Sequence, residues 1–218
     1  MTPIIQSNPQ QLAAVQLPEH VAVINDCRLA HAKIYEPGND LSGRSRYSVT
    51  LLIPKTCDMT RIQAASRAAV VKGIKDKWNG MQPANLKLPI MDGDMYAAQK
   101  PEKRAAYVGM WYINAKQNPE FGKPVILNER RVRSNDKNEV QSGDYATVVV
   151  EFVPYTNATG NGVTVIPKTI RKTRTGDHFG GGLSETDALA ALGGELTEEE
   201  AALIGIDGGA DSGLSNLF

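Results

Sequence analysis

Apolar and polar side chains alternate over the stretch that follows Ser142-Gly143-Asp144, and this pattern predicts the clearest strand of the chain. Its inward parity is wholly apolar: Ala146, Val148, Val150 and Phe152. Such alternation is typical of a half-buried β-strand. The return strand is Val163–Arg174, and we place the hairpin connection at Thr156–Gly162 because Asn161-Gly162 is a turn dipeptide. A long antiparallel hairpin predicts a mainly β fold.

Two earlier stretches alternate in the same way and predict further strands. The first is Val21–Leu29, continuing with a bend through Ala30–Tyr35, and the second is Tyr47–Ile53. The expected inward residues are Val21, Val23, Cys27 and Leu29 in the first strand and Tyr47, Val49, Leu51 and Ile53 in the second. A short strand is also predicted over Lys123–Asn128.

Residues Tyr107–Lys116 hold three aromatic rings and end on an amide and a cation. Read as one strand, one parity faces the core: Tyr107, Gly109, Trp111, Ile113 and Ala115. On the other parity we expect Tyr112, Asn114 and Lys116 at a rim. An aromatic strand beside cations suits a surface that stacks nucleic-acid bases, and it equally suits an ordinary buried strand.

One long helix is predicted over Thr60–Trp78, capped by Asp58 or Thr60. Its apolar stripe places Trp78 in the core, and its basic face reads as solvated. The following 80–104 segment has three prolines and no predicted element. Within that segment, Asp92-Gly93-Asp94 is read as a turn in preference to a metal-binding pair.

The net charge of zero hides a division of the chain into two parts of opposite charge. Residues 1–176 hold 24 basic and 15 acidic side chains, whereas residues 177–218 hold no basic and nine acidic ones. A body of +9 attracts polyanions, and a tail of −9 either serves an interaction or is simply solvated. We therefore expect a flexible arm over 1–18, a β domain over 19–176 and a disordered, Gly-rich acidic tail over 177–218.

The tail nevertheless contains two short helical patterns. Ser184–Gly193 and Thr197–Gly205 each open with a capping residue and acidic side chains and close on glycine. Both are shorter than the roughly 12–15 residues that an isolated helix needs, so we expect them to form transiently or on a partner.

Several function classes find no support in the sequence. No run of eighteen apolar residues predicts a membrane span, and no secretory signal is evident, so Cys27 and Cys57 are expected as free thiols in a reducing cytoplasm. The sequence has no zinc-type spacing and no Walker or Rossmann glycine pattern. We expect no metal, no cofactor and no enzymatic activity.

Short motifs spread over residues 21–170 together resemble a family of tailed-phage single-stranded-DNA-binding proteins. They are Asn25–Pro37, Tyr47–Lys55, Lys77-Trp78, Leu86–Asp94, Tyr112–Ala115, Ser142–Tyr145 and Gly162-Val163. The resemblance implies an OB-fold barrel, a role in phage replication or recombination in the cytoplasm of the infected bacterial host, and a tail that recruits replication or recombination proteins. The usual OB order places the helix after the third strand. Here only two strands precede Thr60, so either the first strand bends and serves twice or the topology is a variant.

The leading hypothesis is sequence-independent binding of single-stranded DNA by base stacking and phosphate neutralisation, with the tail competing for the basic groove. The predicted stacking residues are Tyr107, Trp111 and Tyr112. The predicted phosphate contacts are Arg44, Arg46, Lys116, Arg131, Arg133, Lys168, Arg171, Lys172 and Arg174. The predicted partner-binding residues of the tail are Glu198, Glu199, Glu200, Asp207, Asp211 and Phe218. The alternative is a structural or scaffolding phage protein that does not bind nucleic acid.

Overall fold

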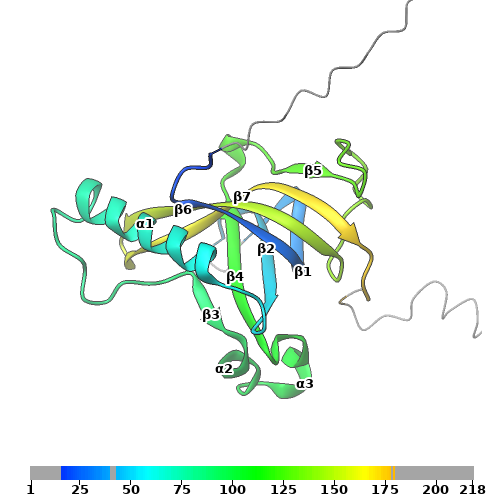
Figure 1. Cartoon of the computed structure of the whole chain (residues 1–218), viewed down its shortest axis with the longest axis horizontal. Coiled ribbons are helices and arrows are strands. Elements are labelled where there is room, and N and C mark those ends of the chain that lie inside the picture. The colour runs from blue at the N-terminus through cyan, green and yellow to red at the C-terminus, as the bar shows by residue number, and fades with distance from the viewer. Residues whose placement is uncertain (1–15, 40–42, 178, 180–218) are drawn as a thin grey trace, which may run out of the picture. The chain divides into compact units, whose positions relative to one another are not determined.

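Five strands close into a barrel in the computed structural model, which describes residues 16–39, 43–177 and 179 (Figure 1). In chain order they are β1 (Val21–Asn39), β2 (Ser45–Pro54), β4 (Met110–Gln117), β6 (Tyr145–Asn157) and β7 (Gly160–Arg174). Neighbouring strands pair antiparallel in the order β4-β2-β1-β6-β7. A parallel pairing of Ala115 with Val165 joins β4 to β7 and closes the barrel.

β1 is long enough to serve two neighbours, which explains how a barrel forms although only two strands precede the helix. Its first part, Val21–Arg28, pairs with β6, and its second part, from Arg28 to Asn39, pairs with β2. Of the two explanations offered by the sequence, the bent first strand is therefore observed. The helix position is also a variant, because the helix follows the second barrel strand.

The predicted inward residues at the start of β1 are wrong. Ala22 and Ile24 are buried there, whereas Val23 is 37% exposed. The register shifts between Ile24 and Cys27, where Asp26 adopts a φ of 47°. A bulge inserts an extra residue and so reverses which parity faces the core. Beyond the bulge, Cys27 and Leu29 are buried as predicted.

Helix α1 (Thr60–Asp76) lies along one side of the barrel and buries Ile62, Ala65 and Ala69 against it (Figure 1). The Asp58 carboxylate accepts a hydrogen bond from the backbone N–H of Thr60 at 2.9 Å, which satisfies one donor of the first turn. Trp78 is in the core as predicted, with its ring packed on Gly73, where a Cβ would lie 2.5 Å from the ring.

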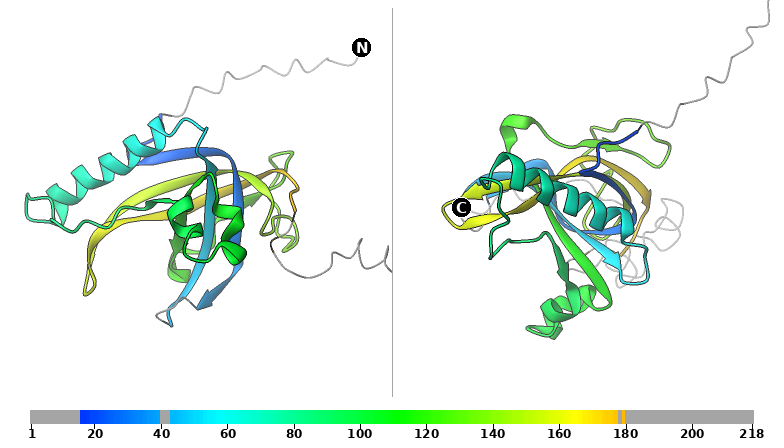
Figure 2. Two further views of the ribbon diagram at one scale, coloured as in Figure 1. Left: turned by 90° about the horizontal axis from the view of Figure 1, so that it is seen from below. Right: turned by 60° about the vertical axis from the view of Figure 1, so that its left-hand side comes forward.

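The prediction of a single helix is not borne out, because the segment after α1 forms structure of its own. It contains β3 (Ile90–Asp92), α2 (Gly93–Ala97), α3 (Pro101–Arg104) and the 3-10 turn η1 (Ala105–Tyr107). Figure 2 shows the short helices (green) beside β2 and β4. Asp92 caps α2 by accepting hydrogen bonds from Asp94 and Met95, so Asp92-Gly93-Asp94 begins a helix.

The β6–β7 hairpin turns earlier than predicted. Asn157 pairs with Gly160, so Ala158 and Thr159 form the tip and Asn161-Gly162 lies within β7. After the 3-10 turn η2 (Pro119–Phe121), the short strand β5 (Val125–Leu127) pairs in parallel with β7, within the stretch predicted as a strand. Among the described residues, no helix is long and apolar enough to cross a membrane.

The expected N-terminal arm and acidic tail lie almost wholly outside the described residues. Both short helical patterns of the tail and all six predicted partner-binding residues are among the residues left undescribed.

Candidate nucleic-acid interface

The outward face of β2 and β4 consists of two halves with different surroundings. The register aligns Ser48 with Lys116, Thr50 with Asn114 and Leu52 with Tyr112. We call the part formed by Arg46, Ser48, Asn114 and Lys116 the open half, and the part formed by Leu52, Met110 and Tyr112 the covered half. The two halves meet at Thr50.

The open half lines a groove of about 520 Å³ that the β6–β7 hairpin borders on one side. The groove residues are Arg44, Arg46, Pro89, Met91, Asn114, Lys116, Tyr155, Asn157, Thr159, Val163 and Thr164. Three of them are cations, and none of these described lining residues is a carboxylate. The structure thus places Lys116 of β4 beside Arg44 and Arg46 at the start of β2, and all three were predicted as phosphate contacts.

A second hollow of about 420 Å³ continues the groove along β2 towards β1. It shares Arg46, Asn114 and Lys116 with the groove and adds His31 and Asn39 from β1. The Arg46 guanidinium also donates a hydrogen bond to the Asn118 side chain, which fixes its direction.

A short hydrogen-bonded chain supports the amide of Asn114 from below. Thr50, only 6% exposed, donates its hydroxyl hydrogen to Asn114 Oδ1 at 2.7 Å. Burial raises the pKa of Tyr107, and a side-chain hydrogen bond to Thr50 acts in the opposite direction. Because Oδ1 is occupied by Thr50, Asn114 offers its amide N–H groups to the groove.

The covered half packs against α2 and η1, where Tyr112 forms an aromatic cluster with Tyr96 of α2 and Tyr107 of η1. The rings of Tyr96, Tyr107 and Tyr112 lie 4.9–5.2 Å apart between centroids, with the Arg104 guanidinium 3.6 Å from the Tyr96 centroid. Tyr107 is 7% and Tyr112 9% exposed. Edge-to-face packing of this kind stabilises a core. Two of the three predicted stacking rings, Tyr107 and Tyr112, therefore lie inside the protein, with Tyr112 packed beside Leu52 of the outward face.

The strand predicted from Tyr107 onwards begins only at Met110, because Tyr107 ends η1 and Gly109 adopts a φ of 71°. Ile113 and Ala115 face the core and Asn114 and Lys116 are exposed, as that prediction stated.

Trp111, the third predicted stacking residue, is half-buried against the core. The Lys55 ammonium lies 4.7 Å from its ring centroid. The same ammonium bridges Asp92 at 2.8 Å and Asp94 at 2.7 Å. These hydrogen bonds lower the pKa of both carboxyl groups and raise that of Lys55. The bridge holds α2, and with it the cover of the aromatic cluster, against β2.

The predicted phosphate contacts at the end of β7 have partners within the protein. Lys168 pairs with Glu151 at 2.8 Å, Lys172 with Asp144 at 3.2 Å and Arg174 with Asp26 at 3.3 Å. The Arg171 guanidinium donates to the Thr147 hydroxyl at 3.2 Å. The partners of these side chains thus offset much of the electrostatic repulsion expected among the four cations.

Arg131 and Arg133 belong to the loop after β5. Leu127 of β5 pairs with Arg171 on one side and bridges to Arg133 on the other. This loop is therefore next to the β7 cluster, and neither arginine lines the groove of the open half.

Sequence reasoning did not select Tyr155 or Phe179. Tyr155 lines the groove near the hairpin tip, and its outward parity in β6 was the available signal. Phe179 packs on the aromatic cluster, and the Arg28 guanidinium lies 4.2 Å from its ring centroid. Arg28 also donates to the Asp177 carbonyl at 2.7 Å, so the first residues of the expected tail contact the barrel.

A closed five-stranded barrel with this pairing order, hollowed on its second and third strands between two loops, is an OB-fold. In that class, this face and these loops bind oligonucleotides and oligosaccharides. The family model described as "Enterobacter phage Enc34, ssDNA-binding protein" matches residues 20–202, and the chain belongs to this family.

Two solved structures share the fold. The single-stranded DNA-binding protein from bacteriophage Enc34 in complex with ssDNA has a TM-score of 0.63 and 22% identity, covering 78% of this chain and 99% of that chain. A C-terminal truncation of the bacteriophage Enc34 protein gives a TM-score of 0.61 and 22% identity, covering 73% of this chain and 89% of that chain. The chain matches none of the curated proteins with which it was compared.

Proposed function

We propose that this protein binds single-stranded DNA without sequence preference in the groove of the open half. One observation carries the proposal: Arg44, Arg46 and Lys116 converge on the oligonucleotide face of an OB-fold. Membership of a family described as ssDNA-binding and likeness to a protein solved with ssDNA support it.

Binding proceeds through two kinds of contact. The cations neutralise phosphates and release counterions, so affinity falls as salt rises. The ring of Tyr155 offers a face on which any base can stack. Asn114 adds amide N–H groups, which donate to a phosphate oxygen or to a base carbonyl alike. Tyr107 contributes only indirectly, through its side-chain hydrogen bond with Thr50, which in turn holds Asn114.

A salt titration with labelled oligonucleotides tests the proposal. We expect a mixed-sequence single strand to bind about as tightly as a thymine homopolymer, with a linear fall of log K against log salt. The same sequence as a duplex serves as the control and should bind more weakly. Absence of any binding at about 50 mM salt would favour the scaffolding alternative.

We further propose that the acidic tail competes with DNA for the basic groove. Its nine acidic and no basic side chains motivate this, as do Asp177 and Phe179, which already contact the barrel. Truncation after Phe179 should tighten binding most at low salt, and truncation after Gly176 should add the effect of releasing Phe179. A full-length variant with the tail carboxylates changed to amides is the matched control. Equal affinity of all four proteins across salt would refute competition.

The tail tip is proposed to recruit replication or recombination proteins in the cytoplasm of the infected host. Its acidic side chains and terminal Phe218 motivate the proposal. A tail peptide should capture such proteins from infected-cell extract, and a peptide lacking Phe218 should capture less. Identical capture by both peptides would rule out a role for the terminal ring.

A further inference from the structure

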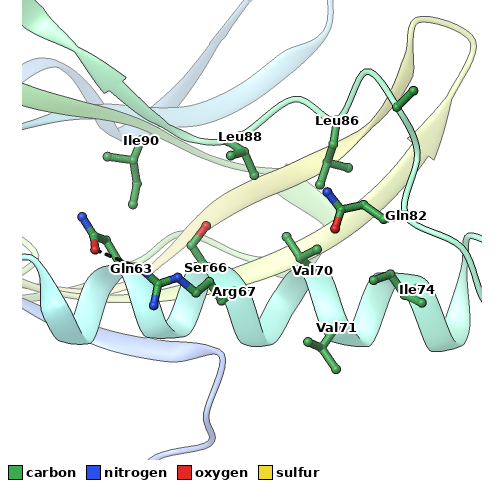
Figure 3. A pocket seen from close by; sticks show the side chains of 11 residues that line it. Gln63, Ser66, Arg67, Val70, Val71, Ile74, Gln82, Leu86, Leu88 and Ile90 are labelled. Carbon is green, nitrogen blue, oxygen red and sulfur yellow. Dashed lines mark hydrogen bonds between the residues drawn. The ribbon is translucent and has the colours of Figure 1, made fainter.

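A second groove, of about 550 Å³, lies between α1 and the segment 82–90. Figure 3 shows Val70 and Ile74 of α1 facing Leu86 and Leu88 across it, with Gln63, Ser66 and Arg67 towards one end. The groove is largely apolar and open, and Leu88 remains 56% exposed. Exposed apolar grooves of this size are typical of sites that take an apolar partner.

This groove shares a wall with the groove of the open half. Leu88 and Ile90 line the groove beside α1, whereas the alternate residues Pro89 and Met91 line the groove proposed for DNA. The two grooves have no lining residue in common, so they can be occupied and tested independently.

The groove has one charged lining residue, the cation Arg67. The surrounding residues 59–90 carry six basic side chains and one acidic one. Arg67 makes a 3.4 Å hydrogen bond to Gln63, which directs it along the groove (Figure 3). A fitting occupant is therefore apolar at one end and acidic at the other.

We propose that the groove beside α1 binds the chain's own tail segment Leu196–Ile206 as a short helix. Its predicted first turn is Glu198–Glu200, and its last turn holds Leu203 and Ile204. Laid parallel to α1, it sets the carboxylates at Arg67 and the apolar turn at Val70 and Ile74. A helix too short to be stable alone is stabilised by such a groove.

Lengths agree with this placement. Along α1, the distance from Arg67 to Ile74 is about 10 Å at 1.5 Å per helical residue. The distance from Glu198 to Leu203 or Ile204 in a helix is about the same. The spacer Gly180–Glu195 reaches about 50 Å when extended, against a radius of gyration of about 15 Å for a domain of this size. The arm over residues 1–15 contains no acidic side chain and so offers no partner for Arg67.

Disulfide trapping in the full-length protein tests the proposal. All variants carry Cys57→Ser, because Cys57 is exposed and would react. Cys27 is kept, since burial raises its pKa to about 12 and makes its thiol unreactive. Leu88→Cys combined with Leu203→Cys should cross-link about tenfold faster than Leu88→Cys combined with Leu214→Cys, which lies in the same tail. Circular dichroism verifies that each variant is folded.

Charge reversal tests whether Arg67 contacts the acidic turn of the tail. Arg67→Glu should slow the cross-link of the Leu203→Cys variant about threefold, and adding Glu199→Arg should restore it. A cross-link found only between two molecules would assign the groove to the tail of a second copy, with the same segment as occupant.

Equal rates for the two tail positions would overturn the proposal. So would a faster cross-link from Leu12→Cys in the arm, or protection of the Leu88→Cys thiol by an oligonucleotide in a variant truncated after Phe179. The cross-linking reaction contains no DNA, so its outcome is independent of the proposed DNA binding. Either proposal can fail while the other holds.

Discussion

The open and covered halves of the β2–β4 face are built from the same two strands and the same parity, yet they offer opposite chemistry. In the open half, Arg46 and Lys116 line a groove, whereas further along the same two strands Leu52 and Tyr112 are buried. The difference comes from α2 and η1, which cover one half only. A strand's alternation decides which side chains point outwards, and a separate segment decides which of those meet solvent.

The largest effect is expected from removing two cations of the open half. Arg46→Ala with Lys116→Ala should weaken single-strand binding about 100-fold at low salt, at roughly 1.4 kcal/mol for each lost charged contact, and lower the salt slope by about 1.4. Fluorescence anisotropy measures both quantities.

The matched double variant is Lys168→Ala with Arg174→Ala, which removes two cations that already pair with Glu151 and Asp26. We expect a loss of only about threefold from it, since these charges are neutralised locally. An equal loss in the two double variants would show that the β7 cluster binds DNA as strongly as the open half.

The next largest effect is expected from removing a single ring, either Tyr155 from the groove of the open half or Tyr112 from the covered half. Tyr155→Ala should weaken binding about tenfold at an unchanged melting temperature, because a stacking ring is lost from the groove. Tyr112→Ala should instead destabilise the fold by about 3–5 kcal/mol and leave the affinity of the folded fraction unchanged. Reversal of these two outcomes would mean that the aromatic cluster opens to bind DNA.

The boundary between the halves is tested by removing one hydroxyl. Thr50→Val keeps the shape but frees Asn114 to rotate, so affinity should fall about threefold, the equivalent of one neutral hydrogen bond. Thr50→Val should have no further effect in an Asn114→Ala background. Tyr96→Phe, which removes a hydroxyl from the covered half, is the control and should bind like the unmodified protein.

The smallest effect concerns the bridge that holds the cover. Because Lys55 lowers the pKa of Asp92 and Asp94, its stabilisation is present above about pH 4 and is lost as the pH falls through their lowered values. The raised pKa of Lys55 affects only the alkaline side. Lys55→Met should therefore lower the melting temperature at pH 6, and this effect should diminish as the pH falls below about 4.

Lys72→Met removes a comparable surface pair with Asp76 and provides the control. Its effect on the melting temperature should be smaller, because that pair joins two residues of the same helix. A pH-independent effect of Lys55→Met would indicate that Lys55 acts through packing on Trp111.

The local parts of the fold and of the site were readable from the sequence. Alternation at Ala146–Phe152 located β6, and the apolar stripe located α1. Arg44, Arg46 and Lys116 became candidates because they lie at the ends of predicted strands. Each signal depends on neighbours within a few positions along the chain, which is the range that side-chain periodicity reports.

Only the tertiary structure decided which of those side chains are available. The bulge at Asp26 reversed the parity of β1, and the segment after Gly93 buried Tyr107 and Tyr112. Carboxylates on other strands and loops paired with three of the four β7 cations. The sequence determined a mainly β barrel with a basic body, since strand periodicity and charge are properties of the chain itself. The exposure of a ring or cation depends on contacts with distant segments, which no local pattern encodes.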